Sequence, residues 1–243
     1  MLGHFPPSLE RSLIVSCQAP ADSPLHQPHI IATIAQAALL RGASAVRLDT
    51  PAHIQAVRSL QPKSFIIGLW KQMIPGYAVY ITPQFHHAEA IAAAGADIIA
   101  LDCTQRDRPG GETVADLITR IHEDLGKGVM ADVDSLDAAK HAVDAGADWV
   151  GTTLYGYTEA TAQEKPPGFR LLEQMVKTLT VPCICEGGIA SPTQARQALE
   201  LGAYAVVVGT AITGIDLQVT QYCQALQNSP ALQTLKDGSV SVL

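Results

Sequence analysis

The feature that most constrains the fold is a Gly-Ala pair that recurs at nearly equal intervals. The glycines at 42, 95, 146 and 202 stand 53, 51 and 56 residues apart, and an alanine follows each of them. Each pair lies where a helix-like segment ends and a β-branched run is about to begin. Glycine tolerates the left-handed backbone that commonly follows a helix. Because each interval has room for two strand–helix units, four copies predict eight such units.

Short apolar runs rich in β-branched residues provide eight candidate strands. They span residues 13–17, 45–48, 65–69, 98–101, 128–131, 149–151, 183–185 and 205–208. Segments with helical spacing, such as 30–39 and 138–143, lie between them. This alternation predicts parallel strands joined by helical crossovers, and the fourfold rhythm favours a closed (β/α)8 barrel over an open doubly wound sheet. No linker divides the chain, so we expect one barrel domain over residues 1–243.

Composition and charge exclude several function classes. The chain has 16 Lys and Arg against 23 Asp and Glu, a net charge of −7, and 47% of its residues are hydrophobic. It can therefore bury a large core, and it offers no basic stripe for nucleic acid. No apolar run approaches the ~18 residues of a membrane span. Five scattered cysteines, an odd number, are expected to be reduced thiols, which favours a cytoplasmic protein. His86-His87 is interpreted as an exposed helix start, and we expect no metal site.

Polar residues follow the predicted strands, where active sites of such barrels lie. A lysine at a strand end can simply reach solvent, but burial beside Trp70 and the charge of Arg47 would lower the pKa of Lys71 and make it a base. Glu186 follows a buried run and precedes two glycines. Alternation places Glu186 and Ile184 on one face of the strand, which would be the barrel interior if Glu186 belongs to the site. The full set is Gln18, Arg47, Lys71, Asp102, Asp132, Thr152, Thr153, Glu186, Gly209 and Thr210.

Several of these residues have a second interpretation. Asp132 can serve the site or cap the following helix, although Asp134 is better placed as the cap. Arg106 and Arg108 can contact a substrate or form a salt-bridged loop. Cys183 and Cys185 alternate with Ile184, so we expect their thiols to pack against helices rather than form a metal or redox site.

Two glycine-containing loops predict a phosphate site. Gly187-Gly188 precedes a helix start at Ser191-Pro192, and Gly209-Thr210 follows the last strand. The loops after the seventh and eighth strands hold phosphate in many barrels, on backbone N–H groups that glycine leaves accessible. Glycine also serves tight turns, which is the alternative here. We expect Gly187, Gly188, Gly209 and Thr210 to bind a phosphate.

Together these motifs resemble the N-acetylmannosamine-6-phosphate 2-epimerase family, from about residue 9 to residue 215. The motifs are Ser16-Cys17-Gln18-Ala19, Val46-Arg47, Gly68-Leu69-Trp70-Lys71, Val79-Tyr80-Ile81-Thr82-Pro83, Leu101-Asp102-Cys103-Thr104, Met130-Ala131-Asp132, Gly151-Thr152-Thr153-Leu154, Gly156-Tyr157-Thr158, Glu186-Gly187 and Val207-Val208-Gly209.

The resemblance implies a (β/α)8 barrel that interconverts N-acetylmannosamine 6-phosphate and N-acetylglucosamine 6-phosphate without a metal or nucleotide cofactor. It also implies a homodimer that works in the breakdown of amino sugars such as sialic acid. Lys71 and Glu186 match the proton-transfer residues. Substrate-binding positions are matched by Gln18, Arg47, Asp132, Thr153 and Tyr157. Two departures stand out: residues 72–76 are neutral where the family has charged and aromatic residues, and Gly188 replaces a longer polar side chain.

Two other functions remain compatible with the residues. A barrel lysine such as Lys71 can form a Schiff base with a sugar phosphate, as in lyase-type aldolases. A phosphosugar-binding barrel without turnover is the other alternative, although a sensor would not need both Lys71 and Glu186.

Overall fold

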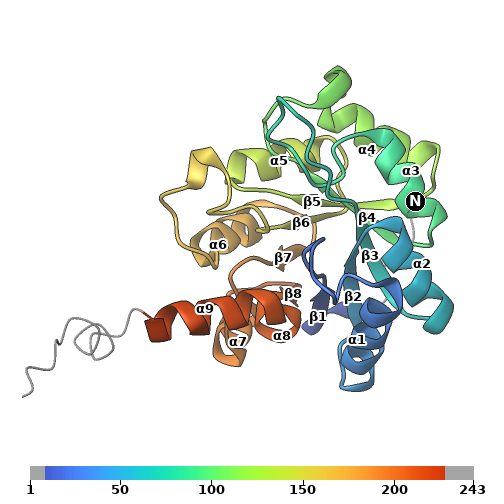
Figure 1. Ribbon diagram of the computed structural model, residues 1–243. Helices are drawn as coiled ribbons and strands as arrows, with labels where there is room; N and C mark the ends of the chain where they lie inside the picture. Colours follow the sequence, from blue (N-terminus) through green and yellow to red (C-terminus); the bar gives the residue numbers. More distant parts are fainter. Residues whose placement is uncertain (1–8, 228–243) are drawn as a thin grey trace, which may run out of the picture.

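Eight parallel strands pair in sequence order and close into a barrel in the computed structural model, which describes residues 9–227 (Figure 1). They coincide with the eight predicted runs or are one residue longer. The ring closes through pairing of the first and last strands, which confirms the predicted (β/α)8 barrel. The strands are β1 (Ser12–Cys17), β2 (Ala45–Asp49), β3 (Phe65–Leu69), β4 (Ile98–Asp102), β5 (Gly128–Asp132), β6 (Trp149–Gly151), β7 (Cys183–Cys185) and β8 (Ala205–Val208).

Helices surround the barrel, and several begin at a side-chain cap. Ser135 and Ser191 each accept a hydrogen bond from the backbone N–H three residues later, as N-caps do. Asp134 is therefore not the cap that the sequence favoured; its carboxylate accepts a hydrogen bond from Thr158 instead. The helices are α1 (Pro28–Leu40), α2 (Pro51–Leu60), α3 (Phe85–Ala93), α4 (Val114–Glu123), α5 (Leu136–Asp144), α6 (Phe169–Thr178), α7 (Pro192–Glu200), α8 (Thr210–Thr213) and α9 (Ile215–Gln227), with 3-10 turns η2 (Pro109–Gly111) and η3 (Glu159–Thr161).

The four Gly-Ala pairs mark one repeated connection from a helix to the next strand. Their glycines have φ between 97° and 105°, the left-handed region that glycine adopts without strain. The alanine after each glycine is buried. The next residue then donates a backbone hydrogen bond to the strand before the helix, from Ser44 to Leu13, Asp97 to Ile66, Asp148 to Val129 and Tyr204 to Cys183. The repeat therefore ties α1, α3, α5 and α7 to the amino-terminal end of the barrel.

The core has two layers, because successive strand residues face opposite sides. Ile184 belongs to the cluster that fills the barrel, together with residues such as Met130 and Trp149. Cys183 and Cys185 belong to the cluster between the barrel and the helices, as predicted. Both thiols are free, and burial raises the pKa of Cys185 to about 12.

His87 differs from its prediction. It belongs to the start of α3, but its ring is buried and accepts a hydrogen bond from the backbone N–H of Gln84. Burial and the neighbouring His86 lower the pKa of His87 to about 4, which suits this acceptor role.

No helix between residues 9 and 227 is long and apolar enough to cross a membrane. Residues 1–8 and 228–243 lie outside the described residues, so a single domain over the whole of 1–243 stays a prediction.

Gly68 tests how closely β3 packs on the helices. A Cβ at this position would lie 2.4 Å from Ile91 Cγ2 and 2.6 Å from Ala96 Cβ. We expect Gly68→Ala to lower the free energy of unfolding by about 1–3 kcal/mol through overpacking. Gly42→Ala is the matched comparison: nothing lies within 4 Å of its Cβ, and only its φ of +102° opposes the change. Urea unfolding measures both, and an unchanged stability for Gly68→Ala would contradict the packing described here.

Candidate active site

A buried arginine lies at the centre of the candidate site. Arg47, on β2, points into the barrel and is 1% exposed. Its Nη1 and Nη2 donate to Asp132 Oδ1 and Oδ2 at 3.1 and 2.5 Å, and its Nη1 lies 3.2 Å from Glu186 Oε2. Burial disfavours the guanidinium charge, but the two carboxylates outweigh it and raise the pKa of Arg47. One cation is thus shared by two acidic side chains.

Glu186 is the acidic side chain with a pKa close to neutrality. It follows β7 directly and is 9% exposed. Burial, the largest cause, and the charge of Asp132 raise its pKa while the charge of Arg47 lowers it, and the net result is a pKa of about 7. A carboxyl group with such a pKa holds and releases a proton near pH ~7, which general acid–base chemistry requires.

Thr153 connects the two carboxylates. Its Oγ1 lies 2.7 Å from Asp132 Oδ1 and 3.2 Å from Glu186 Oε2. A hydroxyl has one proton, so it donates to one carboxylate at a time and can accept from Glu186 when that group is protonated. Thr153 therefore lies in the site where the sequence placed it, and its hydroxyl contacts the two carboxylates.

Lys71 and Gln18 form the opposite part of the site. Lys71 Nζ donates to Gln18 Oε1 at 2.5 Å, and Gln18 Nε2 donates to Ser16 Oγ at 2.9 Å. Lys71 is exposed, so the expected burial beside Trp70 is wrong. Its ammonium is nonetheless close enough to Glu186 to oppose the effect of burial on the pKa of that group. The two predicted proton-transfer residues therefore lie at the same end of the barrel.

The two predicted phosphate loops follow the neighbouring strands β7 and β8, and the first begins directly after Glu186. Gly187 and Gly188 have φ of 95° and 69°, and neither makes a backbone hydrogen bond to another described residue. A Cβ at Gly188 would lie 2.4 Å from Pro166 Cβ, so a longer side chain does not fit here without movement. Gly209 and Thr210 follow β8, beside Ser16 of β1. Tyr157 is 55% exposed and lies over Gly187; partial burial and then the charge of Glu186 raise its pKa.

Comparison with known proteins identifies the family. Residues 31–228 match a family model described as "Putative N-acetylmannosamine-6-phosphate epimerase". Relatives with the 2-epimerase description occur in Thermosynechococcus vestitus, 67% identical over 88% of this chain and 93% of that protein, and in Synechococcus elongatus, 63% identical over 91% and 96%. The chain belongs to the N-acetylmannosamine-6-phosphate epimerase family.

A solved structure of the same family has the same fold. The N-acetylmannosamine-6-phosphate 2-epimerase from Clostridium perfringens superposes with a TM-score of 0.85 at 40% identity, over 90% of this chain and 94% of that one. A 3-hexulose-6-phosphate synthase from Salmonella typhimurium, with a TM-score of 0.59 and 21% identity, shares the fold alone. The family match extends to residue 228, beyond residue 215 where the motif resemblance ends.

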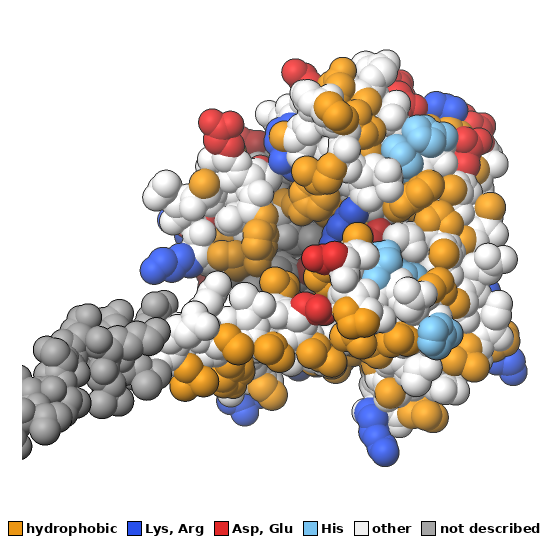
Figure 2. All heavy atoms as spheres, viewed as in Figure 1, with side chains coloured by type: hydrophobic (Ala, Val, Ile, Leu, Met, Phe, Trp, Pro, Cys, Tyr) orange, Lys and Arg blue, Asp and Glu red, His pale blue; other side chains and the backbone are white. Residues whose placement is uncertain are grey.

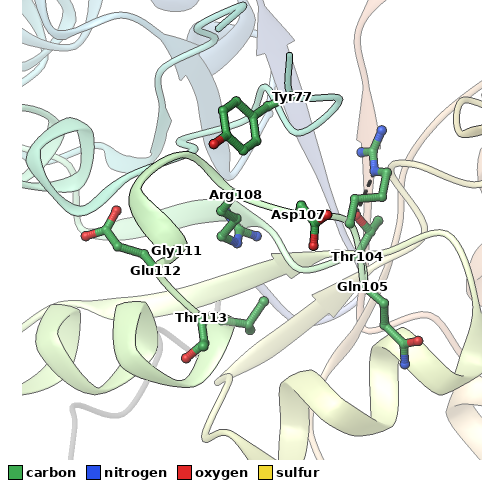
Figure 3. A pocket seen from close by; sticks show the side chains of 10 residues that line it. Tyr77, Thr104, Gln105, Asp107, Arg108, Gly111, Glu112 and Thr113 are labelled. Atoms are coloured by element: carbon green, nitrogen blue, oxygen red, sulfur yellow. Dashed lines mark hydrogen bonds between the residues drawn. The ribbon is translucent and has the colours of Figure 1, made fainter. Parts of the chain in front are cut away.

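Among the described residues, neither loop arginine makes a hydrogen bond or ion pair with Arg47, Asp132 or Glu186. Arg106 donates to Asp102, Thr104 and the backbone of Ala78. The loop thus contains the salt bridge of the second interpretation. A cavity of about 480 Å³ lies beside it, and Figure 3 shows Tyr77 on one side of this cavity with Arg108 and Asp107 on the other. Arg108 Nε and Nη2 have no partner among the described residues, but both atoms are closed off from solvent. A ligand in the cavity does not reach them in this conformation.

Two residues of the site were missed by the sequence analysis. Asp49 ends β2, and its Oδ1 accepts a hydrogen bond from the backbone N–H of Lys71 at 2.9 Å. Burial raises the pKa of Asp49. Tyr80 lies in range of Asp132 and Asp102, whose charges add to the effect of burial and raise its pKa. Asp49 carried a usable signal, because it is an acidic residue at a strand end; Tyr80 had none beyond its motif.

Within residues 9–227 there is no group of three or more His, Cys, Asp or Glu side chains that could hold a metal ion.

Glu186→Gln tests the burial of this carboxyl group. The folded pKa of about 7 lies above the ordinary 4.5, so over this interval the native state keeps a proton that the unfolded chain releases. The native state therefore loses stability as pH rises through this window. We expect the free energy of unfolding of the wild type to fall relative to that of Glu186→Gln between about pH 5 and about pH 8. Urea unfolding across this range measures the difference, and a constant difference would contradict the raised pKa.

Proposed function

We propose that this protein interconverts N-acetylmannosamine 6-phosphate and N-acetylglucosamine 6-phosphate by removing and returning the proton on C2. The observation that carries the proposal is an ammonium group and a carboxyl group of near-neutral pKa at one end of the barrel, Lys71 and Glu186. Family membership and the activity named for the Clostridium perfringens relative support the same reaction.

The reaction needs two proton carriers. The C2 proton is acidic when C1 is an aldehyde, as in the open-chain sugar, because the electron pair left on C2 then moves onto the C1 oxygen. One of Lys71 and Glu186 takes the proton from one face of C2. The other returns a proton to the opposite face, and the electron pair moves back to form the C2–H bond. Positioned groups of this kind each contribute about 10²–10⁴-fold in rate, so charge stabilisation at the C1 oxygen must add to them.

Arg47, Asp132 and Thr153 support this pair. The guanidinium of Arg47 is enclosed beneath the two carboxyl groups, so we assign it the work of fixing their positions and charge. Its positive charge also acts on the negative charge that develops on the sugar. Thr153 sets the orientation of both carboxyl groups, and Asp132 exchanges protons with sugar hydroxyls during ring opening. Gln18 orients the Lys71 ammonium, and Tyr157 covers the substrate from the loop after β6.

We assign the phosphate to the loops after β7 and β8. The backbone N–H groups of Gly187 and Gly188 have no partner among the described residues, and a phosphate oxygen is an acceptor that suits them. Gly209 and Thr210 lie on the neighbouring loop, and the exposed hydroxyl of Thr210 adds a donor. The first loop follows Glu186 directly and the second follows the neighbouring strand, so a phosphate held there would leave the rest of the sugar at the carboxyl-terminal end of the barrel.

We also propose that the protein acts in the cytoplasm, in the breakdown of amino sugars such as sialic acid. The free thiols of Cys17, Cys103, Cys183, Cys185 and Cys223 support a reducing compartment. The pathway follows from the substrate pair.

Turnover and hydrogen exchange test the reaction together. Purified protein is incubated with N-acetylmannosamine 6-phosphate in deuterated water, and the 2-epimer and the C2 deuterium are followed by NMR. We expect both in the wild type, and a loss of at least about 10²-fold in Lys71→Met and in Glu186→Gln. Lys63→Met, an exposed lysine just before β3, is the matched control and should keep wild-type rates. If the wild type incorporates no deuterium at C2, the protein binds the sugar phosphate without turning it over. If borohydride traps a covalent adduct on Lys71, the protein is a Schiff-base aldolase instead.

We further propose that the protein is a homodimer that pairs through α9. No residue of α9 is buried. Ile215, Val219, Tyr222 and Leu226 follow each other at intervals of four, three and four residues, so they form one stripe of the helix. Figure 2 shows hydrophobic side chains gathered over α8 and α9. A second copy of the chain would cover such a stripe with an equivalent one.

A charged residue introduced into the hydrophobic stripe of α9 tests the proposed dimer. We expect Val219→Glu to shift the molar mass measured by light scattering from that of two chains to that of one, because a buried carboxylate opposes association. Gln221→Glu adds the same charge outside the stripe and should leave the dimer intact. A wild-type mass of one chain would contradict the proposal, and so would a dimer that Val219→Glu leaves unchanged.

A further inference from the structure

The barrel ladder stops short of both predicted proton-transfer residues. Between β3 and β4 the register covers only Ile67 with Ile98 and Gly68 with Ile99. Between β6 and β7 it covers only Val150 with Cys183 and Gly151 with Ile184. Lys71 and Glu186 lie beyond these last pairs. Contacts outside the barrel ladder must hold the backbone from which each of them projects; at Lys71 these include the bridge with Ile81 and the hydrogen bond from its N–H to Asp49 Oδ1.

At Glu186 this task falls to the hydroxyl of Thr152. Thr152 Oγ1 donates to the carbonyl oxygen of Glu186 at 2.8 Å and accepts from the N–H of Glu186 at 3.1 Å. The Thr152 side chain is fully buried, and its own N–H donates to Ile184 at 3.1 Å. One hydroxyl therefore serves both polar groups of the Glu186 backbone.

Thr82 makes comparable contacts with Trp70, the residue before Lys71, and with Ala100. Its Oγ1 donates to the carbonyl oxygen of Ala100 on β4 at 2.7 Å and accepts from the N–H of Trp70 at 3.2 Å. Its own N–H donates to the carbonyl oxygen of Trp70 at 2.9 Å. Trp70 directly precedes Lys71, and Lys71 forms an isolated bridge with Ile81. The hydroxyl thus joins β4 to the end of β3 where the two strands have separated.

The backbone of Thr82 supports a role beyond packing. Its φ is 46°, in the left-handed region that a β-branched residue rarely occupies. Such a conformation is strained and persists where the surroundings hold it, often at functional sites. The side chain is fully buried, so no contact with solvent offsets that strain.

We infer that Thr82 and Thr152 are positioning residues that fix Lys71 and Glu186 through the backbone. This inference rests on the proposed function of those two residues. Each threonine acts as donor and acceptor at once, which serine can reproduce and valine cannot. A displacement of about 1 Å at a reacting group is enough to slow catalysis by about 10²-fold. The two hydroxyls therefore govern the rate of proton transfer more than the binding of substrate.

The experiment compares valine and serine at both positions. We expect Thr82→Val and Thr152→Val to lower kcat by about 10- to 100-fold with KM within about twofold of wild type. Serine at either position should restore most of kcat. The pH dependence of kcat distinguishes the two valine variants. Thr152→Val should raise the apparent pKa that reports the titration of Glu186, because the Glu186 carboxylate is then held less firmly against Arg47. Thr82→Val should leave that apparent pKa unchanged.

Control variants distinguish a loss of positioning from a loss of stability, and they separate this inference from the proposed function. Thr161→Val removes another buried hydroxyl, which accepts the N–H of Gly156, and should change stability without moving the pH profile. If a valine variant does not fold, alanine replaces it and is compared with serine. Wild-type kcat in both valine variants would overturn the inference while the epimerase activity stands. A wild type without C2 exchange would overturn the proposed function itself.

Discussion

The site depends on the buried guanidinium of Arg47. A cation enclosed in a barrel is strongly unfavourable unless anions surround it, so Asp132 and Glu186 are needed for stability as well as for chemistry. One cation cannot neutralise two carboxylates. The surplus negative charge and the burial fall on Glu186, whose pKa rises to about 7. A structural requirement of the barrel thus produces a carboxyl group that exchanges protons at neutral pH.

The two ends of the barrel are held together by different kinds of contact. At the amino-terminal end, the Gly-Ala connections tie helices to strands with backbone hydrogen bonds and small buried side chains. At the carboxyl-terminal end the ladder opens, and side chains replace backbone pairs as the connecting groups. The rigid strands β2 and β5 carry Arg47 and Asp132. Lys71 and Glu186 lie just beyond their strands, at the end of the barrel where substrates bind in this fold, and side-chain hydrogen bonds hold their backbone there.

Much of this architecture could be predicted from the chain alone. The strand bounds and the glycine conformations follow from local patterns, and the strand-end rule located Lys71, Asp132 and Glu186. The sequence left open whether Lys71 is exposed, and it did not indicate that the guanidinium of Arg47 is buried and paired with two carboxyl groups, because both features depend on which strands become neighbours. Ser135 caps α5, while Asp134 accepts a hydrogen bond from Thr158, 24 residues later, a contact between distant segments that local sequence does not reveal.

A direct titration of the Glu186 carboxyl group tests the central claim. The protein is labelled with 13C at glutamate side-chain carboxyls, and the Glu186 signal is assigned by its absence from Glu186→Gln. Its chemical shift is then followed against pH. The account predicts a midpoint near 7. A midpoint near the ordinary 4.5 would mean that Arg47 and solvent fully support the carboxylate, and the proposed proton carrier would be lost.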